Sequence, residues 1–174
     1  MTKAVLLSMS VLAMMSLVAC QTIEHVAGHK ASANLESRSG SNVKGTVHFA
    51  WQGDDVLVTG NFSGLKPNAE QGFHVHEKGD CSALDATSAG GHFNPHTKSH
   101  GMPGSGSNHA GDMPNIKSDA KGNAIYSAKL SGFTYDNGSS GILGRSVVVH
   151  RDPDDYKSQP AGNSGPRIAC GLIQ

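Results

Sequence analysis

Short segments in which apolar and polar residues alternate are the feature that most limits how this chain can fold. The alternation is clear over residues 43–51 and returns over residues 56–62, after the turn-forming sequence Gln-Gly-Asp-Asp. A period of two is typical of a β-strand with one buried face, so these two segments predict a hairpin. Similar runs occupy residues 33–38, 72–76, 115–119, 123–130, 145–150 and 167–173. The chain therefore predicts about eight strands.

Helical spacing of apolar residues does not persist over three turns anywhere beyond the first twenty residues. This disfavours a parallel sheet, which needs crossover helices. We expect an all-β fold, an eight-stranded antiparallel Greek-key sandwich or flattened barrel. Two connections, residues 77–114 and 151–166, are longer than ordinary loops. Long ordered loops in a compact domain usually carry function.

The charge balance excludes one class of partner. The 174 residues, one domain's worth of chain, include 14 Lys and Arg and 14 Asp and Glu, so the formal net charge is zero. Charged residues make up 16% of the chain, against roughly 25% in average proteins. The basic field that nucleic-acid binding needs is absent, and we expect no nucleic-acid partner.

The N-terminus has the order of an export signal, because Lys3 is followed by an apolar run over residues 4–19. This run is shorter than the roughly 20 residues that span a bilayer. It ends in Leu-Val-Ala-Cys20, which resembles a bacterial lipobox and implies a lipid on Cys20; the alternative is an ordinary signal peptide with an incidental cysteine. Gln21 at the next position points to the outer membrane. We expect a signal peptide at 1–19, a lipidated tether at 20–31 and a domain at 32–174, located in the bacterial envelope and facing the periplasm.

The chain has three cysteines, and two of them are candidates for a disulfide. If Cys20 carries lipid, Cys81 and Cys170 remain as a pair in a chain exported to an oxidising compartment. This predicts one disulfide, and two unpaired thiols are the alternative.

Seven candidate metal ligands stand out, most of them among the chain's ten histidines. His74 and His76 lie two apart on a predicted strand, so their imidazoles project from one face, although this pattern alone is more often polar surface. Four nitrogen and oxygen donors of the kind zinc prefers follow within 21 residues of a glycine-rich loop: His92, His100, His109 and Asp112. His150 ends a distant apolar strand.

Six motifs in order make the chain resemble the copper/zinc superoxide dismutases from about residue 43 to residue 174, and Cys81, which comes soon after His76, resembles their bacterial periplasmic branch. The motifs are Gly-Phe-His-Val-His-Glu at 72–77, Gly-Gly-His-Phe-Asn-Pro at 90–95, His-Gly at 100–101, His-Ala-Gly-Asp at 109–112, Gly-Arg-Ser-Val-Val-Val-His at 144–150 and Gly-Pro-Arg-Ile-Ala-Cys-Gly at 165–171.

The resemblance implies one copper and one zinc ion per subunit and the dismutation of superoxide to dioxygen and hydrogen peroxide. The implied copper ligands are His74, His76, His92 and His150. The implied zinc ligands are His92, His100, His109 and Asp112. His92 would bridge the two ions and carry a proton, Asp154 would orient His74 and His100 by hydrogen bonds, and Arg167 would guide the anion. The resemblance also allows for a homodimer.

A noncatalytic envelope module that binds copper or zinc is the rival interpretation, and it predicts that a copper ligand or Arg167 is missing; none is. The loop at 151–166 lacks the glutamate and lysine cluster of animal enzymes. Three lysines are therefore candidates for a steering field: Lys78, Lys98 and Lys157. Four histidines match no ligand position and are expected in surface or tether roles, although the first two could capture metal: His25, His29, His48 and His96.

Overall fold

The computed structural model describes residues 28–174. The predicted signal peptide and most of the predicted tether, including Cys20 and His25, lie outside the described residues. The first strand begins at Lys30, two residues before the domain boundary expected from the sequence. Within the described range, no helix is long and apolar enough to cross a membrane.

Nine strands and one short 3₁₀ turn make up the regular structure of residues 28–174, so the expected all-β class is confirmed. The elements are β1 (Lys30–Ser37), β2 (Lys44–Gln52), β3 (Asp55–Ser63), β4 (Glu70–Gln71), β5 (Phe73–His76), η1 (Thr87–Ala89), β6 (Ile116–Lys117), β7 (Ala124–Ser131), β8 (Ser146–His150) and β9 (Arg167–Leu172).

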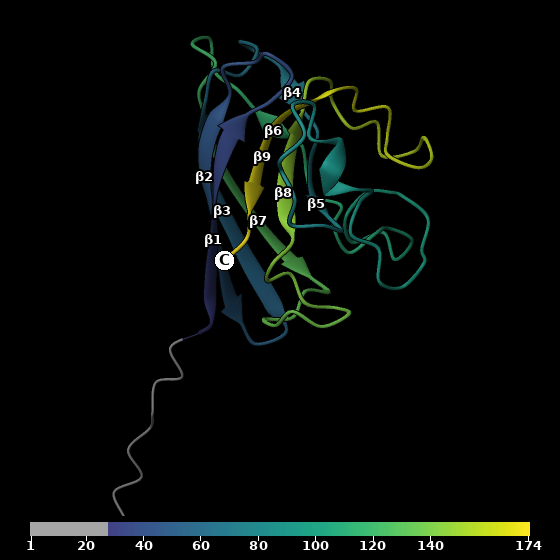
Figure 1. Ribbon diagram of the computed structural model, residues 1–174. Coiled ribbons are helices and arrows are strands. Elements are labelled where there is room, and N and C mark those ends of the chain that lie inside the picture. Colours follow the sequence, from purple (N-terminus) through teal and green to yellow (C-terminus); the bar gives the residue numbers. More distant parts are fainter. Residues whose placement is uncertain (1–27) are drawn as a thin grey trace, which may run out of the picture.

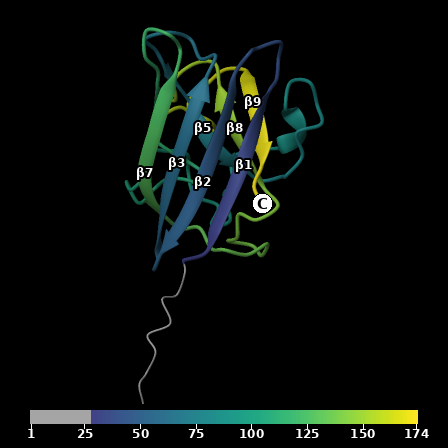
Figure 2. The same cartoon turned by 90° about the vertical axis from the view of Figure 1, so that its left-hand side faces the viewer.

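Seven of these strands form one curled antiparallel sheet in the order β5-β8-β9-β1-β2-β3-β7, and β4 pairs with β6. Figure 2 shows β1, β2, β3 and β7 as one layer with β5, β8 and β9 behind it. The two long loops project beyond β5 and β8, on the side away from β2 (Figure 1). The result is a flattened barrel with both loops on one face.

The strand expected at 72–76 is β5, which begins at Phe73, and the two-residue strand β4 (Glu70–Gln71) was not expected, which accounts for nine strands instead of about eight. Gly72 lies between β4 and β5: its N–H donates to the carbonyl of Asp152 (2.9 Å) and its carbonyl accepts from the N–H of His150 (2.8 Å). The strand expected at 115–119 is reduced to Ile116–Lys117.

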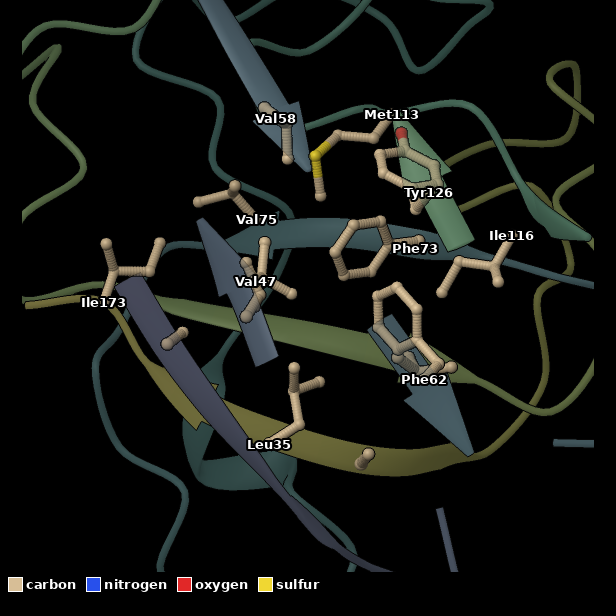
Figure 3. Close-up of a cluster of buried hydrophobic side chains, with 14 of the residues drawn as sticks. Leu35, Val47, Val58, Phe62, Phe73, Val75, Met113, Ile116, Tyr126 and Ile173 are labelled. Carbon is tan, nitrogen blue, oxygen red and sulfur yellow. The ribbon is translucent and has the colours of Figure 1, made fainter. Parts of the chain in front are cut away.

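The core lies between the two layers, where the period-two alternation directs the apolar side chains. In β2, Val47 and Phe49 are fully buried, and they pair with Gly60 and Val58 of β3. Phe73 meets Phe62 and Tyr126 edge-on, with ring centroids 5.4 and 5.2 Å apart (Figure 3). Burial of each such side chain contributes roughly 1.5–3 kcal/mol.

Every residue of β5 and β8 is buried, unlike the alternating β2 and β3. Phe73 and Val75 belong to the core, so His74 and His76 point to the opposite face of the strand. The long loops cover that face. The fold thus places two imidazoles beneath a layer of loop residues.

The predicted disulfide between Cys81 and Cys170 is confirmed, with Cα atoms 5.7 Å apart. It joins the loop at 77–114 to β9 and packs against Ala86, Ala89 and Val148. Because it closes a loop of 89 residues, the chain-entropy model assigns it about 4.6 kcal/mol of stability.

Candidate metal centre

The seven predicted ligands come from three parts of the fold that meet over β5. The glycine-rich loop folds back along the strand, so that His74 is bridged to Asp112 and His76 to His92 through the backbone. A register shift at the end of β8, between Val149 and His150, brings in the last imidazole. All seven side chains are buried.

The first ligand group contains four imidazoles whose donor atoms lie within 4.8 Å of one another: His74, His76, His92 and His150. The Nε2 atoms of His76 and His150 are 3.4 Å apart. Their Nδ1 atoms donate to the backbone carbonyls of Gly90 (3.0 Å) and Gly165 (3.1 Å). Because a carbonyl only accepts, these bonds leave each neutral Nε2 free of a proton and available to a metal.

The second ligand group contains three imidazoles and one carboxylate: His92, His100, His109 and Asp112. Asp112 Oδ1 lies 2.9, 3.1 and 3.2 Å from the Nδ1 atoms of His92, His100 and His109. Its Oδ2 accepts from the backbone N–H groups of Gly101 (3.1 Å) and His109 (2.9 Å). Burial alone would raise the pKa of Asp112, but the hydrogen bonds with His100 and His92 and the nearby His109 ring outweigh it and hold this pKa well below its ordinary value.

His92 belongs to both groups. Its Nδ1 faces Asp112 in the second group, and its Nε2 is buried without a hydrogen-bond partner while facing the first. The ring stacks on that of His74, with centroids 3.9 Å apart. One imidazole therefore connects the two groups through its two nitrogens.

Asp154 lies behind both groups. Its Oδ2 is 2.8 Å from Nε2 of His74 and its Oδ1 is 2.9 Å from Nε2 of His100. Burial opposes protonation of His100, yet Asp112 and Asp154 together raise its pKa to about 9. Burial lowers the pKa of His150 to about 4, against the opposing bond to the Gly165 carbonyl.

Buried ring nitrogens without partners test whether these residues fit metal ions. His74 Nδ1, His92 Nε2 and His109 Nδ1 have no hydrogen-bond partner; His109 Nδ1 is 3.2 Å from Asp112 but outside hydrogen-bonding geometry. A buried polar atom left unsatisfied costs about 1–3 kcal/mol. Four imidazoles suit Cu(II), and three imidazoles with a carboxylate suit zinc. The donor sets therefore fit both ions.

Arg167 lines the opening above the first group, together with Pro160 and Ala161. Its half-buried guanidinium donates to the carbonyls of Ala86 (2.6 Å) and Gly90 (2.5 Å). The same Gly90 carbonyl accepts from His76. Gly90 has φ +74°, a left-handed backbone conformation that favours glycine at this position.

The remaining candidates lie away from this opening. The three lysines proposed for steering are exposed and do not line the opening. His48 and His96 are exposed, as expected, and exposed His29 stacks on Tyr135, with centroids 4.3 Å apart. The sequence did not reveal the carbonyls of Gly90 and Gly165 as acceptors, because every residue type has a carbonyl.

The comparisons with known proteins agree with this geometry. The family model described as copper/zinc superoxide dismutase matches residues 43–173. The protein named superoxide dismutase [Cu-Zn] 2 of Aquifex aeolicus is 45% identical over 149 residues, covering 83% of this chain and 86% of its own. The enzyme of Talaromyces marneffei is 43% identical, covering 78% and 92%.

Solved structures give the same result. The crystal structure of the clock protein EA4 has a TM-score of 0.75 at 38% identity, covering 84% of this chain and 94% of its own. A SOD-like protein from Bacillus subtilis has a TM-score of 0.72 at 34% identity, covering 80% and 95%. The chain belongs to the copper/zinc superoxide dismutase family.

Proposed function

We propose that this protein dismutates superoxide: two superoxide anions and two protons give dioxygen and hydrogen peroxide. The observation that carries the proposal is His92, which links a group of four imidazoles to a group of three imidazoles and a carboxylate. Copper would be held by His74, His76, His92 and His150. Zinc would be held by His92, His100, His109 and Asp112.

Bound copper would supply a one-electron redox couple, and zinc, which has no redox chemistry, a fixed positive charge. The chain supplies the positions. Asp112 holds His92 at Nδ1, 2.9 Å away, so Nε2 is the atom at which a proton is held and then passed to a substrate oxygen in the opening. Asp154 fixes the rings of His74 and His100 at their outer nitrogens.

Arg167 would bind and orient the anion. Two backbone carbonyls fix its guanidinium beside the opening, and an arginine stays charged at all working pH values. A fixed cation with free N–H groups can hydrogen-bond a small anion such as superoxide. Pro160 and Ala161 offer no charged side chain on their part of the opening.

A metal-binding module without catalysis explains less of this arrangement, because it gives no role to a fixed arginine at the opening. Metal analysis combined with a superoxide-dismutation assay on the purified protein separates the two functions. We expect one copper and one zinc per chain and fast dismutation. If the protein binds both ions but does not accelerate dismutation, its function is metal binding without catalysis.

We also propose that the protein is exported to the periplasm and anchored in the outer membrane by a lipid on Cys20. The support is the lipobox-like Leu-Val-Ala-Cys20 and the disulfide, which forms in oxidising compartments. Labelling cells with a radioactive fatty acid should mark the wild-type protein and not Cys20→Ser. A wild-type protein without label would contradict the anchor.

We further propose that the protein forms a homodimer. Leu84 and Leu172 are 89% and 41% exposed, and they follow the two disulfide cysteines by three and two residues. Because they lie on the loop and the strand that the disulfide joins, they are candidates for contact with a second copy. Sedimentation equilibrium should give about twice the chain mass; a monomer at all concentrations would contradict the dimer.

A further inference from the structure

Gln159, in the loop at 151–166, pairs with both backbone groups of His100. Its Oε1 accepts from the His100 N–H (2.9 Å), and its Nε2 donates to the His100 carbonyl (2.9 Å). One side-chain amide thus hydrogen-bonds to both the backbone N–H and the backbone C=O of the same residue, as a residue of a neighbouring β-strand does. His100 lies in the other long loop, 59 residues away.

Of the four ligands in the second group, His100 is the one that the loop at 151–166 holds most closely. Its Nδ1 is 3.1 Å from Asp112 and its Nε2 is 2.9 Å from Asp154. Gly162, in the same loop, approaches so closely that a Cβ would collide with Asp154 and lie 2.7 Å from His100 Nε2. Asp154 and Asp112 set the rotation of the ring, but the point from which the ring projects depends on the His100 backbone.

The backbone at His100 has little other support. His100 belongs to no strand, and the residues on both sides of it are irregular. In a loop of this kind, side-chain bonds to the backbone take the place of a ladder. The Gln159 amide satisfies both backbone polar groups of His100. It therefore fixes the Cα position of a ligand residue that is only 3% exposed.

We propose that Gln159 is a positioning residue for the zinc site: it holds the backbone of His100 so that Nδ1 meets the ion beside Asp112. This inference rests on the proposed function, because it assigns the second group to zinc. The chemistry requires glutamine. Asparagine is one methylene shorter, and glutamate keeps the acceptor for the N–H but sets a negative oxygen against the His100 carbonyl.

The test uses the full chain with cobalt(II) as a spectroscopic replacement for zinc. Gln159→Ala should weaken cobalt binding at the second group about tenfold, the lower end of the effect of removing an outer hydrogen-bond partner of a ligand, and should alter the cobalt absorption bands. Gln159→Glu should weaken binding less. Copper binding should stay near wild type in both variants, because the Gln159 side chain hydrogen-bonds to none of His74, His76 and His150.

Lys157→Ala is the matched control. Lys157 is exposed in the same loop and its side chain bonds to no residue of the loop at 77–114, so this variant should bind cobalt as wild type does. Wild-type affinity and spectrum in Gln159→Ala would overturn the proposal, as would an equal loss in Lys157→Ala. Wild-type protein that binds cobalt but does not dismutate superoxide with copper would instead contradict the proposed function and leave the role of Gln159 intact.

Discussion

Each histidine of the first ligand group on β5 and β8 forms a hydrogen bond to the protein through one ring nitrogen, so its other ring nitrogen is directed into the site. His76 and His150 use Nδ1 for this bond and present Nε2, whereas His74 is held at Nε2 by Asp154 and presents Nδ1. The two arrangements differ because a carboxylate lies behind the ring of His74 and backbone carbonyls lie behind the rings of His76 and His150. Carbonyls or a carboxylate thereby select the tautomer and the ligand atom.

His150→Ala should abolish dismutation while zinc stays bound. His150 is in the first group and not in the second, so the variant removes one copper donor and leaves all four zinc donors. The measurement is metal content together with dismutation rate. His48→Ala, which removes an exposed histidine of β2, should change neither quantity. Full activity in His150→Ala would contradict the copper assignment.

At the scale of elements, the alternating strands could be predicted from the sequence and the irregular contacts could not. Residues 43–51 and 56–62 appear as β2 and β3 because alternation reports directly which face is buried. The two-residue strand β4 could not be predicted, because it is defined by its pairing with β6, which lies far away in the sequence. The pairing of Gln159 with His100 left no pattern for the same reason.

The ligands were predictable through motifs, since each imidazole or carboxylate is a distinctive residue type. His74 and His76 also followed from the geometry of a strand. Their partners were harder to predict: Asp154 was identified by resemblance, while the Gly90 carbonyl, which accepts from both His76 and Arg167, is a backbone group with no sequence signature.

The disulfide connects two elements, and its removal should affect both stability and Arg167. The double variant Cys81→Ser, Cys170→Ser should lower the free energy of unfolding by about 2–5 kcal/mol, measured by urea denaturation. Dismutation should also slow, because the loop joined by the disulfide supplies the Ala86 carbonyl that holds Arg167. Unchanged stability and rate would contradict this role.

At the scale of the whole molecule, a net charge of zero gives no general attraction for an anion. Substrate capture therefore depends on local charge at the opening. The first ligand group also destabilises the metal-free fold in acid, because His74, His76 and His150 are buried together and resist protonation. These two properties give one prediction each.

Arg167→Ala should slow dismutation several-fold without changing metal content, and Arg167→Glu should slow it further. Exposed charges are screened over about 8 Å at physiological ionic strength, so the wild-type rate should fall with added salt and the alanine variant should respond less. The measurement is the rate at low and high salt. Lys157→Ala, an exposed charge away from the opening, is the control. Equal rates in all variants at low salt would show that Arg167 does not guide the substrate.

The metal-free protein should lose stability as the pH falls from about 6.5 to about 4.5. Burial lowers the pKa of His150 to about 4 and those of His74 and His76 well below their ordinary value. The unfolded chain therefore binds more protons in this range, and acid favours unfolding. His100, with its pKa raised to about 9, contributes stability that is fully present below about 6.5 and is lost only as pH rises toward 9, so it does not reverse the trend.

Urea denaturation at the two pH values measures this loss. His150→Gln should reduce the pH dependence, whereas His48→Gln should leave it unchanged because His48 is exposed. Stability that stays constant or rises on acidification would show that the buried imidazoles are protonated in the folded protein.

Stepwise metal loading with a dismutation assay tests the central claim most directly. Metal-free protein is first given zinc and then titrated with copper, and the dismutation rate is followed throughout. Zinc alone should give no activity, and the rate should then rise with copper and level off at one copper per chain, since residues 28–174 hold one group of four imidazoles. A protein that binds one copper and one zinc and still does not accelerate dismutation would contradict the account.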